Sequence, residues 1–135
     1  MSYSFKSELP PEAELADFYE QMGWNAFLNI TPSQLITAMC QSYFSIYVYD
    51  GNKLIATGRV VSDGVINAYI CGLGVLPKYR RHGIGTEIMK KLTEHCTQQN
   101  LHVQFFCEDE LLPYYQKNGF EKFAVGMKFS HTFIT

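Results

Sequence analysis

The sequence predicts an α/β domain with a central mixed sheet, and two patterns support this. Several β-rich runs of alternating residues are separated by turns that contain Gly and Asp, while other segments repeat apolar residues at helical spacing. One helical segment connects two strands, and such a connection places those two strands parallel to each other. The earlier strands are joined by short turns, so the sheet is expected to be mixed. A length of 135 residues suits a single domain over residues 1–135.

The expected order of elements is β-α-α-β-β-β-α-β-α-β-β, a twisted sheet of about seven strands flanked by about four helices. Strands are expected at 3–9, 43–49, 53–61, 65–75 and 101–107, with two more within 120–133, and helices at 11–22, 32–41, 83–98 and 109–118.

Local signals support the helices. The first helix follows Pro11, and its apolar stripe is formed by Leu15, Phe18, Tyr19 and Met22. In the second, Thr31 is the N-cap and Gln34 stands three residues later, which predicts a capping box.

The central strands are bounded by turn signals. Asp50-Gly51-Asn52 predicts a hairpin, and Ser62-Asp63-Gly64 predicts a second turn. Gly72 and Gly74 interrupt the strand at 65–75, which indicates a bulge or a close approach of another backbone. The alternative is that both glycines serve packing only.

Composition excludes several function classes. The net charge of −2 argues against binding nucleic acid through bulk positive charge, and no apolar run is long enough to cross a membrane. No secretory signal is visible at the start, and the four cysteines form no C-x-x-C pair. We therefore expect a cytoplasmic protein with free thiols, no metal site, and no nucleic-acid or membrane partner.

The most informative stretch is the basic loop before the helix at 83–98. Lys78, Arg80 and Arg81 cluster there, and no acidic residue lies between Asp63 and Glu87. Glycines, positive charge and a helix N-terminus together favour binding of a phosphate, although a solvated basic turn is the alternative. The loop lacks the Lys of a Walker motif and the third glycine of a dinucleotide fingerprint.

Two motifs resemble those of the GNAT superfamily, the Gcn5-related N-acetyltransferases that use acetyl-CoA. One is the R-x-x-G-x-G pattern at residues 80–85, and the other is Tyr-Tyr-Gln-Lys-Asn-Gly-Phe at 114–120. Segments 58–60 and 73–75 also fall where such proteins carry them. The resemblance covers nearly the whole chain and implies a single-domain GNAT-like fold.

The resemblance implies roles for individual residues. The cofactor-binding residues would be Leu73, Gly74 and Val75 beside the pantetheine arm, and Arg80, Arg81, His82, Gly83, Ile84, Gly85 and Thr86 around the pyrophosphate. Tyr115 matches the family tyrosine that protonates the departing CoA thiolate. Tyr19, Trp24 and Phe27 fall in the region that shapes the acceptor pocket in the family.

The residues alone do not select a general base. Many family members place a carboxylate on the strand before the phosphate loop, but this chain has Tyr69-Ile70-Cys71-Gly72 there. Asp63, Glu108 and Asp109 flank the strands and stay open as alternatives. Cys71 is apolar-flanked, which favours a packed small side chain over an acyl-enzyme nucleophile.

The function expected is transfer of an acetyl group from acetyl-CoA to a primary amine of a small molecule or protein, by direct attack with Tyr115 as general acid. The alternative is a non-catalytic acyl-CoA-binding or regulatory module, which the missing strand carboxylate favours. Monomer and homodimer both stay open.

Overall fold

The computed structural model describes residues 2–130, which divide into two compact units that are described separately. The unit Met1–Gln104 contains β1 (Ser4–Lys6), α1 (Glu12–Gln21), α2 (Asn25–Leu28), α3 (Pro32–Cys40), β2 (Phe44–Asp50), β3 (Lys53–Ser62), β4 (Asn67–Val75), the 3₁₀ turn η1 (Pro77–Tyr79), α4 (Ile84–Gln98) and β5 (His102–Gln104). The unit Phe105–Thr135 contains the 3₁₀ turn η2 (Asp109–Leu111) and α5 (Leu112–Lys117).

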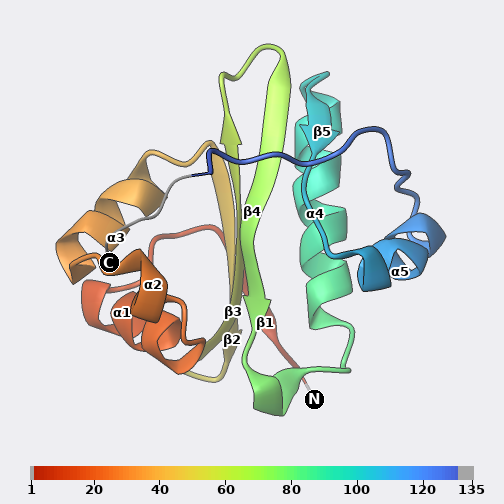
Figure 1. Cartoon of the computed structure of the whole chain (residues 1–135). Helices are drawn as coiled ribbons and strands as arrows, with labels where there is room; N and C mark the ends of the chain where they lie inside the picture. The colour runs from red at the N-terminus through yellow and green to blue at the C-terminus, as the bar shows by residue number, and fades with distance from the viewer. Residues whose placement is uncertain (1, 131–135) are drawn as a thin grey trace. The chain divides into compact units, whose positions relative to one another are not determined.

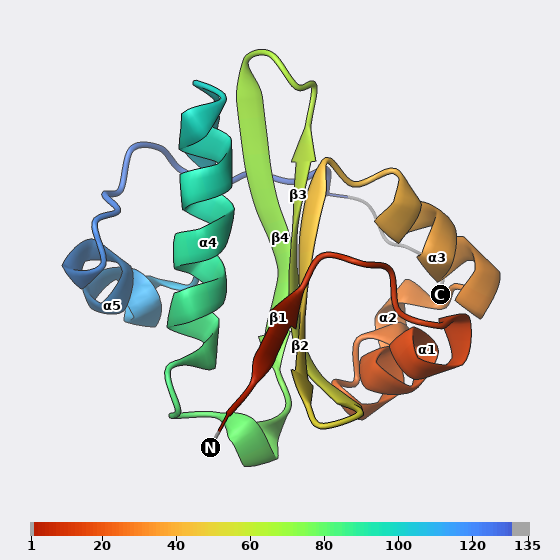
Figure 2. The same ribbon diagram turned by 180° about the vertical axis from the view of Figure 1, so that it is seen from behind.

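The sheet of the first unit is mixed, as predicted. Its strands follow the order β1-β2-β3-β4-β5, in which β1 to β4 pair antiparallel and β4 pairs parallel with β5. Figures 1 and 2 show that α1, α2 and α3 cover one face of this sheet and α4 covers the other. The mixed α/β fold class is therefore confirmed.

The local signals of the sequence form the expected structures. The Thr31 hydroxyl accepts a hydrogen bond from the Gln34 amide at 3.1 Å, and the Gln34 side chain accepts one from the Thr31 amide at 2.9 Å. This is the predicted capping box, and it starts α3. Asp50 pairs with Lys53 across a two-residue turn in which Gly51 has a φ of 62°.

The apolar side chains of a helix pack against each face of the sheet. On one face, α1 buries Leu15 and Phe18. On the other, Ile88 and Leu92 of α4 pack against β3, where a Cβ on Gly58 would stand 2.7 Å from Ile88 Cγ2. Because alternate residues of a strand point to opposite faces, the next residue, Arg59, points toward the α1–α3 side.

The structure corrects the number of strands. The described residues form five strands instead of about seven, and the outer strands β1 and β5 have three residues each. Residues 120–130 form no strand, and residues 131–133 of the expected runs lie outside the described residues. A strand requires a paired neighbour, and the β-forming composition of 120–130 does not supply one. Residues 2–130 contain five α-helices instead of about four, because residues 25–28 add the single turn α2.

Candidate acyl-transfer site

A β-bulge interrupts β4 at Gly72, where the sequence indicated either a bulge or a close approach of another backbone. Thr57 pairs with Gly74 and Arg59 pairs with Cys71, so the single residue between them on β3 opposes both Gly72 and Leu73. Gly72 adopts a left-handed conformation with a φ of 61°, which glycine reaches without a steric penalty. The bulge therefore changes the direction of β4 just before the basic loop.

Beyond the bulge, one edge of β4 has no neighbouring strand. The parallel ladder with β5 covers only Asn67, Ala68 and Tyr69. From residue 70 to 75, no described residue pairs as a strand with that edge. The predicted residues Leu73, Gly74 and Val75 all lie on this part of β4.

Two neighbouring residues anchor the first part of the basic loop. The buried Tyr79 donates a hydrogen bond from its hydroxyl to Asp50 Oδ2 at 2.8 Å. Arg80 Nε donates to the carbonyl oxygen of Val75 at 2.9 Å, which links the loop to the end of β4. Arg81 and Gly83 have φ values of 68° and 79°, so the backbone turns sharply into α4.

The start of α4 is suited to binding an anion. The amides that open a helix have no carbonyl one turn earlier to bind, and the helix dipole adds positive charge there. Arg80, Arg81 and His82 are exposed beside them, whereas Ile84 is buried and can offer only its main chain. A Cβ on Gly83 would meet no atom within 4 Å, so a phosphate can reach this backbone. The first carboxylate of α4, on Glu87, pairs with Lys91 at 3.5 Å.

On the opposite side of β4, the structure brings two of the three predicted acceptor residues together. Trp24 lies edge-on to Tyr19, with ring centroids 5.0 Å apart. The indole also covers Gly74, because a Cβ there would stand 2.5 Å from Trp24 Cζ2 and Cη2. Phe27 lies on α2 with 69% of its surface exposed.

Arg59 also lies on this side of the sheet, although the sequence had not indicated a role for it in the site. Its Nη1 donates to Ser42 Oγ at 3.2 Å, while its Nε is buried with no hydrogen-bond partner among the described residues. The signal was a lone charged residue inside the apolar run 54–61. Burial raises the pKa of Cys71, and Arg59 only partly offsets this, which favours the packed thiol over a nucleophile.

In the second unit, Tyr115 lies within an aromatic cluster. Its ring makes edge contacts with Phe105, Tyr114 and Phe120 at centroid distances of 4.7, 5.0 and 6.1 Å. Burial raises the pKa of Tyr115 above its ordinary value of 10.0, so its hydroxyl keeps its proton at neutral pH. Tyr114 is more exposed, at 41%.

The candidate carboxylates differ in their surroundings. Asp63 Oδ1 accepts hydrogen bonds from the amides of Ile66, Val65 and Asn67, at 2.8, 2.9 and 3.3 Å. These bonds lower the pKa of Asp63, which makes it a weak proton acceptor and identifies it as the cap of the β3–β4 turn. Glu108 and Asp109 lie at the start of η2 in the second unit.

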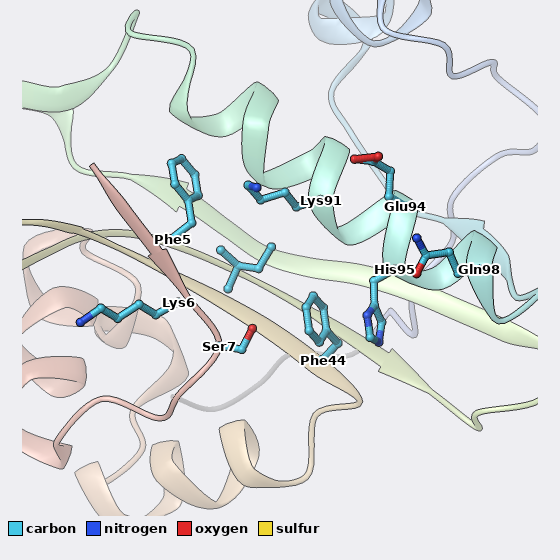
Figure 3. Close-up of a pocket in the computed structure, with 9 residues that line it drawn as sticks. Phe5, Lys6, Ser7, Phe44, Lys91, Glu94, His95 and Gln98 are labelled. Atoms are coloured by element: carbon cyan, nitrogen blue, oxygen red, sulfur yellow. The ribbon is translucent and has the colours of Figure 1, made fainter. Parts of the chain in front are cut away.

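A separate hollow of about 370 Å³ lies on the α4 side of the sheet (Figure 3). It is lined by residues of β1, β2 and α4 and the residue after β1. Phe44 stacks on His95 there, with ring centroids 3.8 Å apart, and Lys91 Nζ lies 5.5 Å from the Phe5 ring. None of the predicted site residues lines this hollow. In residues 2–130, no group of three His, Cys, Asp or Glu side chains could hold a metal ion. No helix in that range is long and apolar enough to cross a membrane.

Comparisons with known proteins agree with this architecture. A protein from Streptococcus pneumoniae described as an acetyltransferase of the GNAT family superimposes with a TM-score of 0.76 at 23% identity, covering 96% of this chain and 98% of that one. This likeness shows the fold.

Sequence comparisons identify the family. The chain is 32% identical over 77 residues to GCN5-related N-acetyltransferase 2, chloroplastic, from Arabidopsis thaliana, a match that covers 56% of this chain and 30% of the relative. It is 25% identical over 122 residues to an uncharacterized N-acetyltransferase, ycf52, of Porphyra purpurea, covering 85% and 67%. The chain spans less than half the length of the plant relatives that it matches.

The model of the Acetyltransferase (GNAT) family matches residues 7–120, a range that includes the bulged strand, the basic loop and the Tyr115 segment. This chain therefore belongs to the GNAT family of acetyltransferases.

Proposed function

We propose that this chain transfers an acetyl group from acetyl-CoA to a primary amine. The observation that carries the proposal is the continuity of two features: the unpaired edge of β4 after its bulge, and the helix N-terminus that the basic loop leads into. The first can pair with the amides of an extended pantetheine arm, and the second can bind a pyrophosphate.

The residues present fit that donor. Leu73, Gly74 and Val75 would offer main-chain groups to the pantetheine arm. The pyrophosphate would be bound by the loop and helix start, namely Arg80, Arg81, His82, Gly83, Ile84, Gly85 and Thr86. The open approach to Gly83, where a Cβ meets nothing within 4 Å, supports close contact between phosphate and backbone.

Tyr115 is the proposed general acid. When the thioester is cleaved, the sulfur leaves with the electron pair of the broken bond and is a better leaving group if it gains a proton. A tyrosine hydroxyl is protonated at neutral pH, and burial, which raises the pKa of Tyr115, keeps that proton on the oxygen until the thiolate forms. The main-chain amide of Val75 is the proposed donor to the oxygen that develops negative charge.

The acceptor is proposed to approach from the α1–α3 side, past Tyr19 and Trp24. Its amine must be neutral to attack the acetyl carbon. An alkylamine such as that of lysine has an ordinary pKa of about 10, so it must lose a proton first. Phe27, exposed on α2, is the third proposed acceptor contact.

We further propose that residues 1–135 act as one domain, because the family match from 7 to 120 crosses the boundary between the two compact units. The acceptor would be a small molecule or a protein, the location cytoplasmic, and the assembly a monomer or a homodimer.

The test is release of CoA thiol from acetyl-CoA across a panel of primary amines. Tyr115→Phe keeps the ring, so CoA binding should survive while turnover falls by about 100-fold, the lower end of the range for a general acid. Tyr114→Phe is the matched control and should be nearly silent. Binding of CoA without amine-dependent thiol release would instead support the non-catalytic alternative. Full turnover in both variants would show that Tyr115 only packs.

A further inference from the structure

Arg59 carries a positive charge that its surroundings do not balance. It lies in β3 between the buried residues Gly58 and Val60. Among the described residues the Nε atom is buried without a hydrogen-bond partner, Nη1 donates to the neutral hydroxyl of Ser42, and the Tyr19 hydroxyl is a second neutral partner of Arg59. Within residues 2–130, no carboxylate lies within salt-bridge distance of Arg59, since the ion pair found there joins Glu87 and Lys91. Arg59 is half-buried, and a cation partly removed from water without a counter-charge is less favourable than a fully solvated one.

The side chains around Arg59 do not supply a negative charge at neutral pH. The charge of Arg59 acts on Tyr19, Tyr47 and Cys71, which are therefore its near neighbours. Burial nevertheless raises the pKa of each of these groups, so all three stay protonated and neutral. The titratable groups on which Arg59 acts are thus tyrosine hydroxyls, Tyr69 among them, and a thiol.

The missing counter-charge has a defined position. A Cβ built on Gly72 would stand 3.4 Å from Arg59 Nε and 3.6 Å from its Cγ, and the three atoms nearest to that Cβ all belong to Arg59. A carboxylate on residue 72 would therefore meet Arg59 first. Because residue 72 is glycine, the chain places no side chain of its own at this position, and Gly72 and Arg59 are both partly exposed to a group from outside.

The position is also close to the proposed reaction centre. Gly72 precedes Val75 by three residues, a span of at most about 10 Å along an extended strand. We infer that the acceptor is a small primary amine that also carries a carboxylate, which pairs with Arg59 over Gly72 while the amine reaches toward Val75. This inference rests on the proposed acetyl transfer for its amine, and on Arg59 and Gly72 alone for its carboxylate.

The first test compares matched acceptors in the thiol-release assay. The pairs are 5-aminopentanoate with pentylamine and 6-aminohexanoate with hexylamine, which differ by the carboxylate. A charge-assisted hydrogen bond corresponds to about ten- to 100-fold in affinity, so kcat/KM should favour at least one acid of the two pairs by about that ratio. Arg59→Gln should bring the ratio close to one. Lys53→Gln, which removes a charge from the exposed start of the same strand, should leave it unchanged.

Two results of that assay would overturn the inference while leaving acetyl transfer intact. One is equal kcat/KM for the acidic and neutral member of both pairs. The other is a preference for the acid that persists in Arg59→Gln. Absence of thiol release with every amine would count against the proposed function, and a second experiment then decides the role of Arg59 without turnover.

The second experiment supplies the missing carboxylate from the chain itself. Gly72→Asp and Gly72→Asn have nearly the same shape, and both residues tolerate the left-handed backbone that position 72 requires. Gly72→Asp should melt at a higher temperature than Gly72→Asn, because only Asp can pair with the Arg59 charge. The difference should disappear when Arg59→Gln is added to both. A Gly72→Asp variant no more stable than Gly72→Asn would show that Arg59 has no place for a carboxylate, and would refute the inference.

Discussion

Substitution of Gly74 by Ala tests the contact between the bulged strand and Trp24. The added Cβ would lie 2.5 Å from Trp24 Cζ2 and Cη2, which must retreat to at least 3.4 Å for an ordinary contact. The indole cannot move freely, because Tyr19 and Phe18 pack edge-on against it at centroid distances of 5.0 and 5.9 Å. Met22 Cε, at 2.8 Å from the same Cβ, ends a flexible side chain and can move at little cost.

The expected loss is the cost of overpacking, about 1–3 kcal/mol in the free energy of unfolding. At about 3.5 °C per kcal/mol for a chain of this length, the melting temperature should fall by roughly 4–11 °C. Denaturant unfolding followed by circular dichroism measures the free energy. Trp24 is the only tryptophan of the chain, so its fluorescence emission reports the displaced ring directly.

A double-mutant cycle with Trp24→Phe isolates the contact. A smaller ring leaves room for the new methyl, so the double variant should be less destabilised than the sum of the single ones by about 1–2 kcal/mol. Gly74→Ala with wild-type stability and unchanged Trp24 emission would refute the packing described. Strictly additive costs would do the same.

Three further predictions concern the loop, the helix start and the buried tyrosines. Arg80→Ala and Arg81→Ala should each weaken CoA binding by about tenfold or more, with a smaller loss at high salt, because each removes a charge-assisted phosphate contact. Calorimetry at two salt concentrations measures this affinity, with Lys53→Ala as the control. Unchanged affinity in both arginine variants would show that the loop is only a solvated turn. Gly85→Ala should keep or raise the stability of the protein, by up to about 1 kcal/mol, because the new Cβ meets only Val75 Cγ2 at 3.8 Å. The same methyl group should weaken CoA binding, because it blocks the approach of the pyrophosphate to the backbone. Undiminished affinity would argue against close approach of the pyrophosphate at that residue. Burial holds the pKa values of Tyr19 and Tyr47 above 10.0, so above that pH the native state retains protons that the unfolded chain releases. The free energy of unfolding should therefore fall as pH rises. Denaturant titrations between about pH 8 and 11 should show a shallower decline in Tyr19→Phe, and an identical slope would contradict this assignment.

Short-range chemistry allowed much of this protein to be predicted from its sequence. The Thr31–Gln34 capping box, the turn after Asp50 and the left-handed Gly72 of the bulge each depend on residues that are close together in the chain. The basic loop leading into a helix start was predictable for the same reason, because the basic residues and glycines lie within a few residues of it. The family motifs lie in these local segments, which is why the superfamily could be named from sequence.

The remaining features depend on contacts between distant segments, which only the tertiary structure decides. Trp24 lies on Gly74, fifty positions later in the chain, because the segment between α1 and α2 packs over β4. The composition of 120–130 favours strands, but strand formation requires an unpaired edge at the right register, and residue composition does not encode one. Arg59 could be seen in the sequence as a charge in an apolar strand. The register of β3 against β4 places Arg59 opposite Cys71 and under the bulge. Its Nε is therefore buried beside Gly72, and none of the described carboxylates forms an ion pair with it.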